Sequence, residues 1–268
     1  MQLFQKFLKK LQNINMHGNN KIICIAGKNQ CAIDALTYLI KNFKNLKILA
    51  LPNRKDSGKD GWQKSFKKFA IKNKIKITSL KELYKINNLY LFSLEYEDIL
   101  NTKKFRSNKL FNFHFSLLPK YRGCHTNFYQ IFYGEKISGV TLHIINNGID
   151  TGNIIDKIKF RIPVNRTAFE NYKVLLNKSV LLFKKNFSRI LKDRYSSKKQ
   201  NLRKGNYFNR KSVNYNKLIL LKTINQNIKT HNKIRSLIFK PFQLPIYNGN
   251  RIIKSIYKNN KIKLKYLK

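Results

Sequence analysis

Short apolar runs alternate with amphipathic stretches in the first part of the chain, and this alternation constrains the fold more than any other feature. KIICIAG at 21–27 is apolar and ends at Gly27, and the QCAIDALTYLIKNF that follows has apolar residues at helical spacing. KILALPN at 47–53 and LYLFS at 89–93 repeat the strand pattern, with the helix-like SFKKFAIKN between them. Strands that alternate with helices predict a parallel sheet covered by helices, so we expect an α/β, Rossmann-like domain.

The same pattern continues to about residue 192. FNFHFS at 111–116 and GVTLHII at 139–145 are typical of strands, and apolar positions over 168–192 predict a long helix. A polar stretch near 195–206 then marks a boundary, and two prolines and an Asn-Gly pair further on favour strands and loops.

We therefore expect three parts. They are an N-terminal extension (1–20), a catalytic domain (21–195) and a small C-terminal α+β unit (203–268) that serves nucleotide binding or dimerisation.

The charge is extreme but not concentrated at one patch. The chain has 56 Lys and Arg against 12 Asp and Glu, a net charge of +44. Of the 56, 45 are Lys and 11 are Arg, and Asn and Ile are abundant throughout, which is typical of an AT-rich genome. Proteins that bind nucleic acids rely more on Arg than on Lys for base contacts, so the composition makes a nucleic-acid partner the less favoured prediction but does not exclude it. No acid follows Asp193, so this part could bind a nucleotide pyrophosphate or an RNA backbone.

Other compositional features point to the cytoplasm. The three cysteines do not form a CxxC pair, which is typical of free thiols in a reducing compartment. No apolar run reaches the roughly 20 residues that cross a bilayer, and the first 20 residues lack a signal-peptide cleavage pattern.

Two blocks carry the chemistry, FNFHFSLLPKYRG at 111–123 and GVTLHIINNGIDTG at 139–152. Asn112 and His114 are two residues apart, so a strand presents both on one face. Asp150 adds a carboxylate. An amide can donate to an oxyanion, an imidazole can move a proton, and a carboxylate can orient the imidazole. Each residue also has an ordinary interpretation, since a strand histidine is usually a core residue and a turn aspartate usually a turn former.

Two other sites are weaker hypotheses. His114, His125 and His143 could suggest a metal, but their spacing is wider than zinc sites usually show, so we expect none. Cys124 and His125 could form a nucleophile pair, but adjacent residues seldom face each other.

Together the two blocks resemble the formyltransferase family that uses 10-formyltetrahydrofolate. That family's signature is Asn-x-His, SLLP-x-x-x-G, a GVT strand and a Gly-x-Asp-x-Gly turn. Here it is present from Asn112 to Gly152. The resemblance implies a cytoplasmic enzyme, a homodimer and no metal.

Within the family the chain looks most similar to sugar N-formyltransferases of the dTDP-4-amino-4,6-dideoxyglucose type, which act in O-antigen biosynthesis. The segments DGWQKSFKKFA, YFNRKSV and KIRSLIFKPFQLP carry this resemblance. Methionyl-tRNA formyltransferases instead show a Pro where Thr126 stands, and they end in a barrel for which the C-terminal unit is short. Formylation of methionyl-tRNA remains the first alternative, and a non-catalytic RNA-binding protein on this scaffold the second.

The resemblance also implies roles for residues. Asn112 would donate to the oxyanion, His114 would move the proton of the attacking amine, and Asp150 would hold the His114 ring. The residues expected to border the folate are Phe92, Ser93, Leu94, Glu95, Ser116, Leu117, Leu118, Pro119, Asn147, Gly148 and Ile149. The candidates for binding the nucleotide sugar are Trp62, Gln63, Arg210, Lys211, Phe242 and Gln243, while Tyr207 and Phe208 could equally be core residues.

Overall fold

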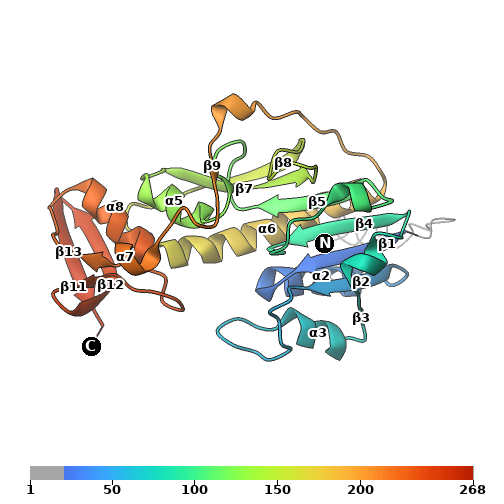
Figure 1. Cartoon of the computed structure of the whole chain (residues 1–268), viewed down its shortest axis with the longest axis horizontal. Coiled ribbons are helices and arrows are strands. Elements are labelled where there is room, and N and C mark those ends of the chain that lie inside the picture. Colours follow the sequence, from blue (N-terminus) through green and yellow to red (C-terminus); the bar gives the residue numbers. More distant parts are fainter. Residues whose placement is uncertain (1–20, 268) are drawn as a thin grey trace, which may run out of the picture.

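The structure is a computed structural model that describes residues 21–267, so the predicted N-terminal extension lies outside the described residues. Figure 1 shows a large sheet with the long helix α6 running along it, and a smaller unit at one end of that helix. Within the described range, no helix is long and apolar enough to span a bilayer.

The large sheet has seven strands in the order β3-β2-β1-β4-β5-β7-β8. The first five are parallel, as the alternating pattern predicts, whereas β7 and β8 run antiparallel to their neighbours. The expectation of a parallel sheet therefore holds for one side of a mixed sheet. The strands are β1 (Ile22–Gly27), β2 (Lys47–Pro52), β3 (Lys76–Ile77), β4 (Leu89–Leu94), β5 (Lys109–His114), β7 (Ile137–Ile144) and β8 (Ile154–Arg161).

Helices cover both faces of this sheet. One face packs against α2 (Asn29–Asn42), α3 (Phe66–Lys72) and α6 (Ala168–Leu191), and Phe92, Phe111 and Phe183 lie in that core. The other face is covered by α4 (Leu80–Leu83) and the segment around the 3-10 turn Thr102–Lys104. Because side chains alternate along a strand, Phe111 and Phe113 face the α6 side, while Asn112 and His114 face the other side.

After α6 the chain returns across the sheet before it enters the small unit (Figure 1). On this return, β9 (Tyr207–Phe208) pairs with β6 (Arg122–Gly123), which precedes α5 (Thr126–Phe132). A short 3-10 turn, Leu202–Lys204, lies before β9. The segment that reads as a polar boundary in the sequence is thus held against the loop that follows β5.

The small unit is built on a four-stranded sheet with α8 against it. The predicted α+β unit is confirmed, although the strand and turn signals of the sequence did not locate the ten-residue α8. Its segment IKTHNKIRSL is largely polar, but the N-cap Asn227 and the buried Ile234 and Leu237 stabilise it as a helix. The elements are α7 (Tyr215–Leu218), β10 (Leu220–Leu221), α8 (Ile228–Leu237), β11 (Ile246–Tyr247), β12 (Asn250–Lys258) and β13 (Lys261–Tyr266).

The two units share a hydrophobic core. Tyr121 and Phe128, from the loop and helix after β5, pack with Ile234 of α8 and Ile252 of β12. Phe208 belongs to this core too, with its ring 3.7 Å from that of Tyr129, so it is a packing residue. The predicted boundaries at 195 and 203 stay predictions, but the units do not pack as separate bodies.

Asp193, just after α6, joins three elements at the amino ends of the strands. Its carboxylate accepts hydrogen bonds from Lys21 (3.1 Å) and Tyr90 (2.7 Å), and it forms a 2.6 Å ion pair with Lys109. Burial opposes the charged form, but these three donors outweigh it and lower the pKa of Asp193 to about 2.

We expect Asp193→Asn to lower the free energy of unfolding by about 1 kcal/mol at neutral pH, a modest value because the carboxylate is partly exposed. A depressed pKa gives stability that is complete above the unfolded-state pKa and is lost as pH falls through the folded-state pKa. Urea unfolding should therefore show a constant difference from wild type between about pH 5 and 8, shrinking below about pH 4. Asp34→Asn, on α2, is the control, because Asp34 forms no ion pair within residues 21–267. A difference that grows on acidification would contradict this.

Candidate active site

Asn112 and His114 lie at the end of β5, next to the turn that carries Asp150. The amide nitrogen of Asn112 lies 3.1 Å from Nε2 of His143 and donates to Oδ1 of Asp150 at 3.3 Å. Nδ1 of His114 lies 3.4 Å from the other carboxylate oxygen of Asp150. The structure thus brings the three residues singled out in the sequence into one hydrogen-bonded cluster.

The ring of His114 is enclosed by oxygen atoms. Its Nε2 lies 2.7 Å from the carbonyl oxygen of Tyr121, and its Nδ1 faces Asp150. A ring with a proton on each nitrogen can donate to both, whereas a neutral ring can donate to only one. The side chain is only 9% exposed, so the ring is oriented before any ligand arrives.

Asp150 is the centre of the cluster. Oδ2 accepts a hydrogen bond from the main-chain N–H of Gly123 at 2.8 Å, and Oδ1 lies 3.4 Å from Nε2 of His143. Burial disfavours the charged carboxylate, but His114, His143 and this N–H outweigh burial and hold the pKa of Asp150 well below its usual range. The residue therefore acts as a permanent anion between two imidazoles.

Sequence reasoning did not include His143 in the acyl-transfer site. On the antiparallel strand β7 it lies directly opposite Asn112. Its Nδ1 lies 2.8 Å from the carbonyl oxygen of Ile144, which leaves Nε2 free to accept from the Asn112 amide. The only signal in the sequence was its place in the strand before the Asp150 turn. Within residues 21–267 no His, Cys, Asp and Glu group has the arrangement of a metal site.

Gln200, on the chain's return from α6, fixes the main chain of the Asp150 turn. Its buried side-chain amide donates to the carbonyl oxygen of Asp150 at 2.9 Å and to that of Gly152 at 2.6 Å. Asp150 has a left-handed φ of +53°, and a Cβ at Gly152 would lie 1.7 Å from the carbonyl oxygen of Ile144. The turn therefore needs Gly at 152 and a donor at 200. No local sequence pattern marks Gln200 as a site residue.

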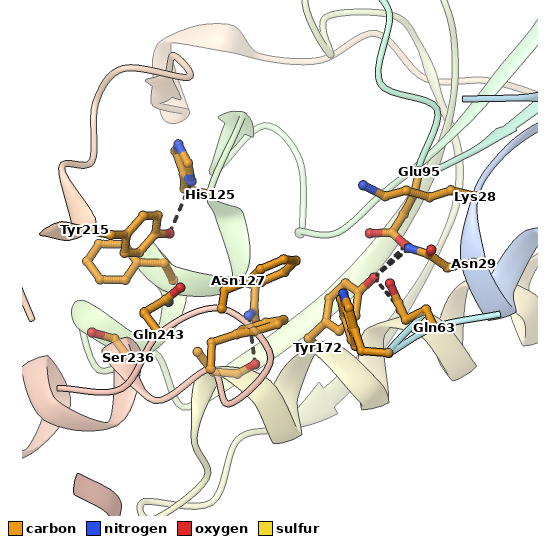
Figure 2. A pocket seen from close by; sticks show the side chains of 15 residues that line it. Lys28, Asn29, Gln63, Glu95, His125, Asn127, Tyr172, Tyr215, Ser236 and Gln243 are labelled. Atoms are coloured by element: carbon orange, nitrogen blue, oxygen red, sulfur yellow. Dashed lines mark hydrogen bonds between the residues drawn. The ribbon is translucent and has the colours of Figure 1, made fainter. Parts of the chain in front are cut away.

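A pocket of about 400 Å³ opens between the large sheet and the small unit (Figure 2). Trp62, Gln63, Phe242 and Gln243, four of the predicted substrate residues, line it. Figure 2 also shows Lys28, Asn29, Glu95 and Tyr172 on one side, and His125, Tyr215 and Ser236 on the other. Asn112, His114 and Asp150 are not among the lining residues, so the pocket lies beside the catalytic cluster.

Arg210 and Lys211 are not in this pocket. Both side chains are exposed in the turn after β9 and do not line the pocket. The main-chain carbonyl oxygen of Arg210 lies 2.9 Å from Nε2 of His125. The structure does not bring these two cations together with Trp62, because the turn directs them to the surface.

The residues expected to border the folate fall into two groups. Phe92, Leu94, Ser116 and Leu118 are buried, so their side chains pack inside the protein and offer only main-chain groups. The residues of the Asp150 turn are exposed instead: Asn147, Gly148 and Ile149. Ser93 is buried next to Asn112, Leu117 and Pro119 are half-buried, and Glu95 faces the pocket.

Comparison with known proteins identifies the family. The family model described as "Formyl transferase" matches residues 96–183, which include the whole cluster except Gln200. The chain is 44% identical to the sugar 3N-formyl transferase WlaRD, with a TM-score of 0.85 over 90% of this chain and 88% of that one. It is 46% identical to an N-formyltransferase from Helicobacter canadensis solved with folinic acid and dTDP-3-aminofucose, with a TM-score of 0.83 over 88% of each chain.

The chain belongs to this formyltransferase family. The curated relatives are more distant or share only part of their length. A methionyl-tRNA formyltransferase from Clostridium tetani is 30% identical over 191 residues, which are 66% of this chain and 62% of that protein. The formyltransferase thus spans less than two thirds of the first curated relatives it matches. Its closeness to sugar N-formyltransferases rests on the two solved structures.

We expect Gln200→Met to loosen the Asp150 turn, because Met has a similar size but no donor for the two carbonyl groups. A buried carbonyl group that loses its partner costs about 1–3 kcal/mol. Hydrogen–deuterium exchange over residues 146–153 should therefore accelerate by about tenfold or more. Gln226→Met, in the small unit, is the control and should leave this peptide unchanged. Equal rates of hydrogen–deuterium exchange over this peptide in wild type and Gln200→Met would show that Gln200 does not stabilise the turn.

Proposed function

We propose that the protein transfers a formyl group from 10-formyltetrahydrofolate to the amine of a dTDP-linked amino sugar. The observation that carries this proposal is the cluster of Asn112, His114 and Asp150 in a chain 44–46% identical to the two solved relatives. The sequence resemblance pointed to a 4-amino sugar as the type. WlaRD is described as a 3N-formyl transferase and the Helicobacter canadensis structure holds dTDP-3-aminofucose, so we propose the amine at carbon 3.

The formyl donor suits the side of the sheet that carries the catalytic cluster. The exposed turn Asn147–Gly148–Ile149 precedes Asp150 and offers main-chain groups and an apolar side chain, that of Ile149, which is 37% exposed. Exposed main-chain groups and an apolar contact are what a flat, polar-edged pteridine needs. We propose that this turn, with the main chain after β4 and the half-buried Leu117, holds the donor.

The mechanism follows from the contacts within the cluster. 10-Formyltetrahydrofolate supplies the formyl group. The Asn112 amide has one firm contact, to His143, and a longer one of 3.3 Å to Asp150, so it can turn the second hydrogen toward the formyl oxygen as that oxygen becomes negative. His114 takes the proton that the attacking amine releases and passes one to the folate nitrogen N10 as its bond to the formyl carbon breaks, while Asp150 stabilises the charged ring.

The acceptor suits the pocket in Figure 2. Trp62 lies with its ring 5.2 Å from that of Phe242 and 6.0 Å from that of Phe239, which gives a flat nucleotide base an aromatic surface. Lys28, which lines the same pocket and forms an ion pair with Glu97, supplies a cation for a diphosphate. The volume of about 400 Å³ lies within the range of ligand sites. We propose Trp62, Gln63, Phe242 and Gln243 as acceptor-binding residues, without Arg210 and Lys211.

The first alternative, formylation of methionyl-tRNA, has less support. After residue 203 the described chain forms a four-stranded sheet with a helix, of which two strands have two residues each, and not a five-stranded barrel. The identity to a tRNA-modifying relative is 30%, against 44–46% for the sugar enzymes. The complete Asn112–His114–Asp150 cluster also argues against the non-catalytic RNA-binding protein. A homodimer, a cytoplasmic location and a role in O-antigen biosynthesis stay predictions.

The test is to incubate the protein with 10-formyltetrahydrofolate and each of three acceptors: a dTDP-linked 3-amino sugar, its 4-amino isomer, and charged initiator tRNA. We expect formylation of the 3-amino sugar with the highest kcat/KM. Asn112→Ala should lower kcat by about 100- to 1000-fold, because it removes the oxyanion donor, and His114→Ala should lower it at least as much. Asn42→Ala, at the exposed end of α2, is the control. Formylation of tRNA alone, or His114→Ala at the parental rate, would refute the proposal.

A further inference from the structure

Glu95 presents a carboxylate to the pocket that we assign to the acceptor. It is the only acidic side chain among those that line this pocket in the described part of the chain. In Figure 2 it lies beside Asn29 and Tyr172, on the wall opposite His125 and Tyr215. The resemblance places Glu95 at the folate border, and in the structure its side chain also lines this pocket and contacts Tyr172 of α6.

The strand register places Glu95 close to the reacting groups. Ser93 of β4 pairs with Asn112 of β5, and the two strands are parallel. Glu95 follows Ser93 by two residues, as His114 follows Asn112. Glu95 and His114 therefore leave neighbouring strands at the same edge of the sheet, with their side chains directed to different sides.

The backbone at Glu95 is fixed in an uncommon conformation. Its φ is +62°, in the left-handed region that non-glycine residues seldom adopt. The buried side chain of Asn53 holds the turn, donating to the carbonyl oxygen of Glu95 at 3.1 Å and accepting from the N–H of Glu97 at 3.1 Å. Such a conformation persists only where the surroundings enforce it, and it often marks a ligand contact.

Only one of the two carboxylate oxygens of Glu95 accepts hydrogen bonds from the described protein. Oε2 accepts from the hydroxyl of Tyr172 at 2.8 Å and from the amide of Asn29 at 3.5 Å. Within residues 21–267, no hydrogen-bond donor reaches Oε1. Lys28, the nearest cation on this wall, forms its ion pair with Glu97 instead, at 2.6 Å. Burial raises the pKa of Glu95, although Lys28 and Tyr172 oppose this. Oε1 is not among the buried unpaired atoms of residues 21–267, so it is accessible at the pocket and available to a ligand donor.

We propose that Oε1 of Glu95 accepts a hydrogen bond from the sugar-ring hydroxyl next to the nucleophilic amine, so that Glu95 determines which amino sugars are formylated. This inference rests on the proposed function. A hydroxyl is the favoured partner because the amine must be unprotonated to attack, and a carboxylate at the amine would stabilise its protonated form. Tyr172, itself bonded to Gln63 at 3.1 Å, keeps the carboxylate turned to the pocket.

The test compares the dTDP-linked 3-amino sugar with deoxy analogues in which hydrogen replaces one hydroxyl next to the amine, at carbon 2 or at carbon 4. We expect Glu95→Ala to lower kcat/KM for the full sugar by about 10- to 100-fold, the usual effect of losing a charge-assisted hydrogen bond. The kcat/KM of wild type should fall by a similar factor on the deoxy analogue that lacks the bonded hydroxyl. The kcat/KM of Glu95→Ala should be nearly the same for this analogue as for the full sugar. Glu95→Gln keeps a hydrogen-bond acceptor, so its kcat/KM for the full sugar should lie between those of wild type and Glu95→Ala.

Asp98→Ala is the matched control, since Asp98 lies three residues away in the same loop, forms its ion pair with the exposed Arg54 and does not line the pocket. Its kinetics should stay near those of wild type, and melting temperatures of all variants establish that they fold. Equal losses in Glu95→Ala on both sugars, or no loss on either, would overturn the inference. Absence of formylation by wild type would instead refute the proposed function, and binding of dTDP measured by calorimetry separates the two failures.

Discussion

The hydrogen bond from the N–H of Gly123 to the carboxylate of Asp150 is the contact on which the site depends. It joins the loop after β5 to the turn after β7 and leaves both carboxylate oxygens facing imidazole rings. Gly123 has a φ of +86°, and a Cβ there would lie 2.2 Å from the carbonyl oxygen of Phe208. The strand pair β6–β9 can form only because this position has no side chain, and that pair sets the position of the donating N–H.

The catalytic cluster is therefore held together by two segments that are far apart in the sequence: the strand pair β5–β7 and the chain that returns from α6. Strands β5 and β7 supply Asn112 and His143, while the return from α6 supplies Gln200 and β9. The buried carboxylate of Asp150 and the amide nitrogens of Asn112 and Gln200 are stabilised because each has a partner in this set. The amide oxygen of Gln200 has none within the described residues. Glu95 differs, since one of its oxygens has a partner in the described protein and the other faces the pocket.

Sequence patterns predicted the parallel half of the sheet and the long helix α6, because strand alternation and helical spacing are local signals. The grouping of Asn112, His114 and Asp150 in one site came from the resemblance to the formyltransferase family. His143 required knowledge that β7 is antiparallel to β5, and Gln200 required the path of the return segment, neither of which is local. Glu95 was placed at the folate border by the resemblance, whereas its side chain, on a left-handed backbone, contacts Tyr172 of α6. The small unit was predicted as α+β, but the position of α8 was not, because its apolar residues are few.

The loop after β5 has consequences for how acceptor specificity could change in evolution. His125 lines the pocket and lies two residues after Gly123, whose N–H holds Asp150. A substitution that shifted this wall to admit a new sugar would also displace the catalytic carboxylate. The segment from Ser236 to Gln243, which lines the same pocket, belongs to the small unit and forms no hydrogen bond or ion pair with Asn112, His114 or Asp150 in the described chain. New acceptors can therefore be accommodated by exchanges in that segment, while the residues that move the formyl group remain under separate selection.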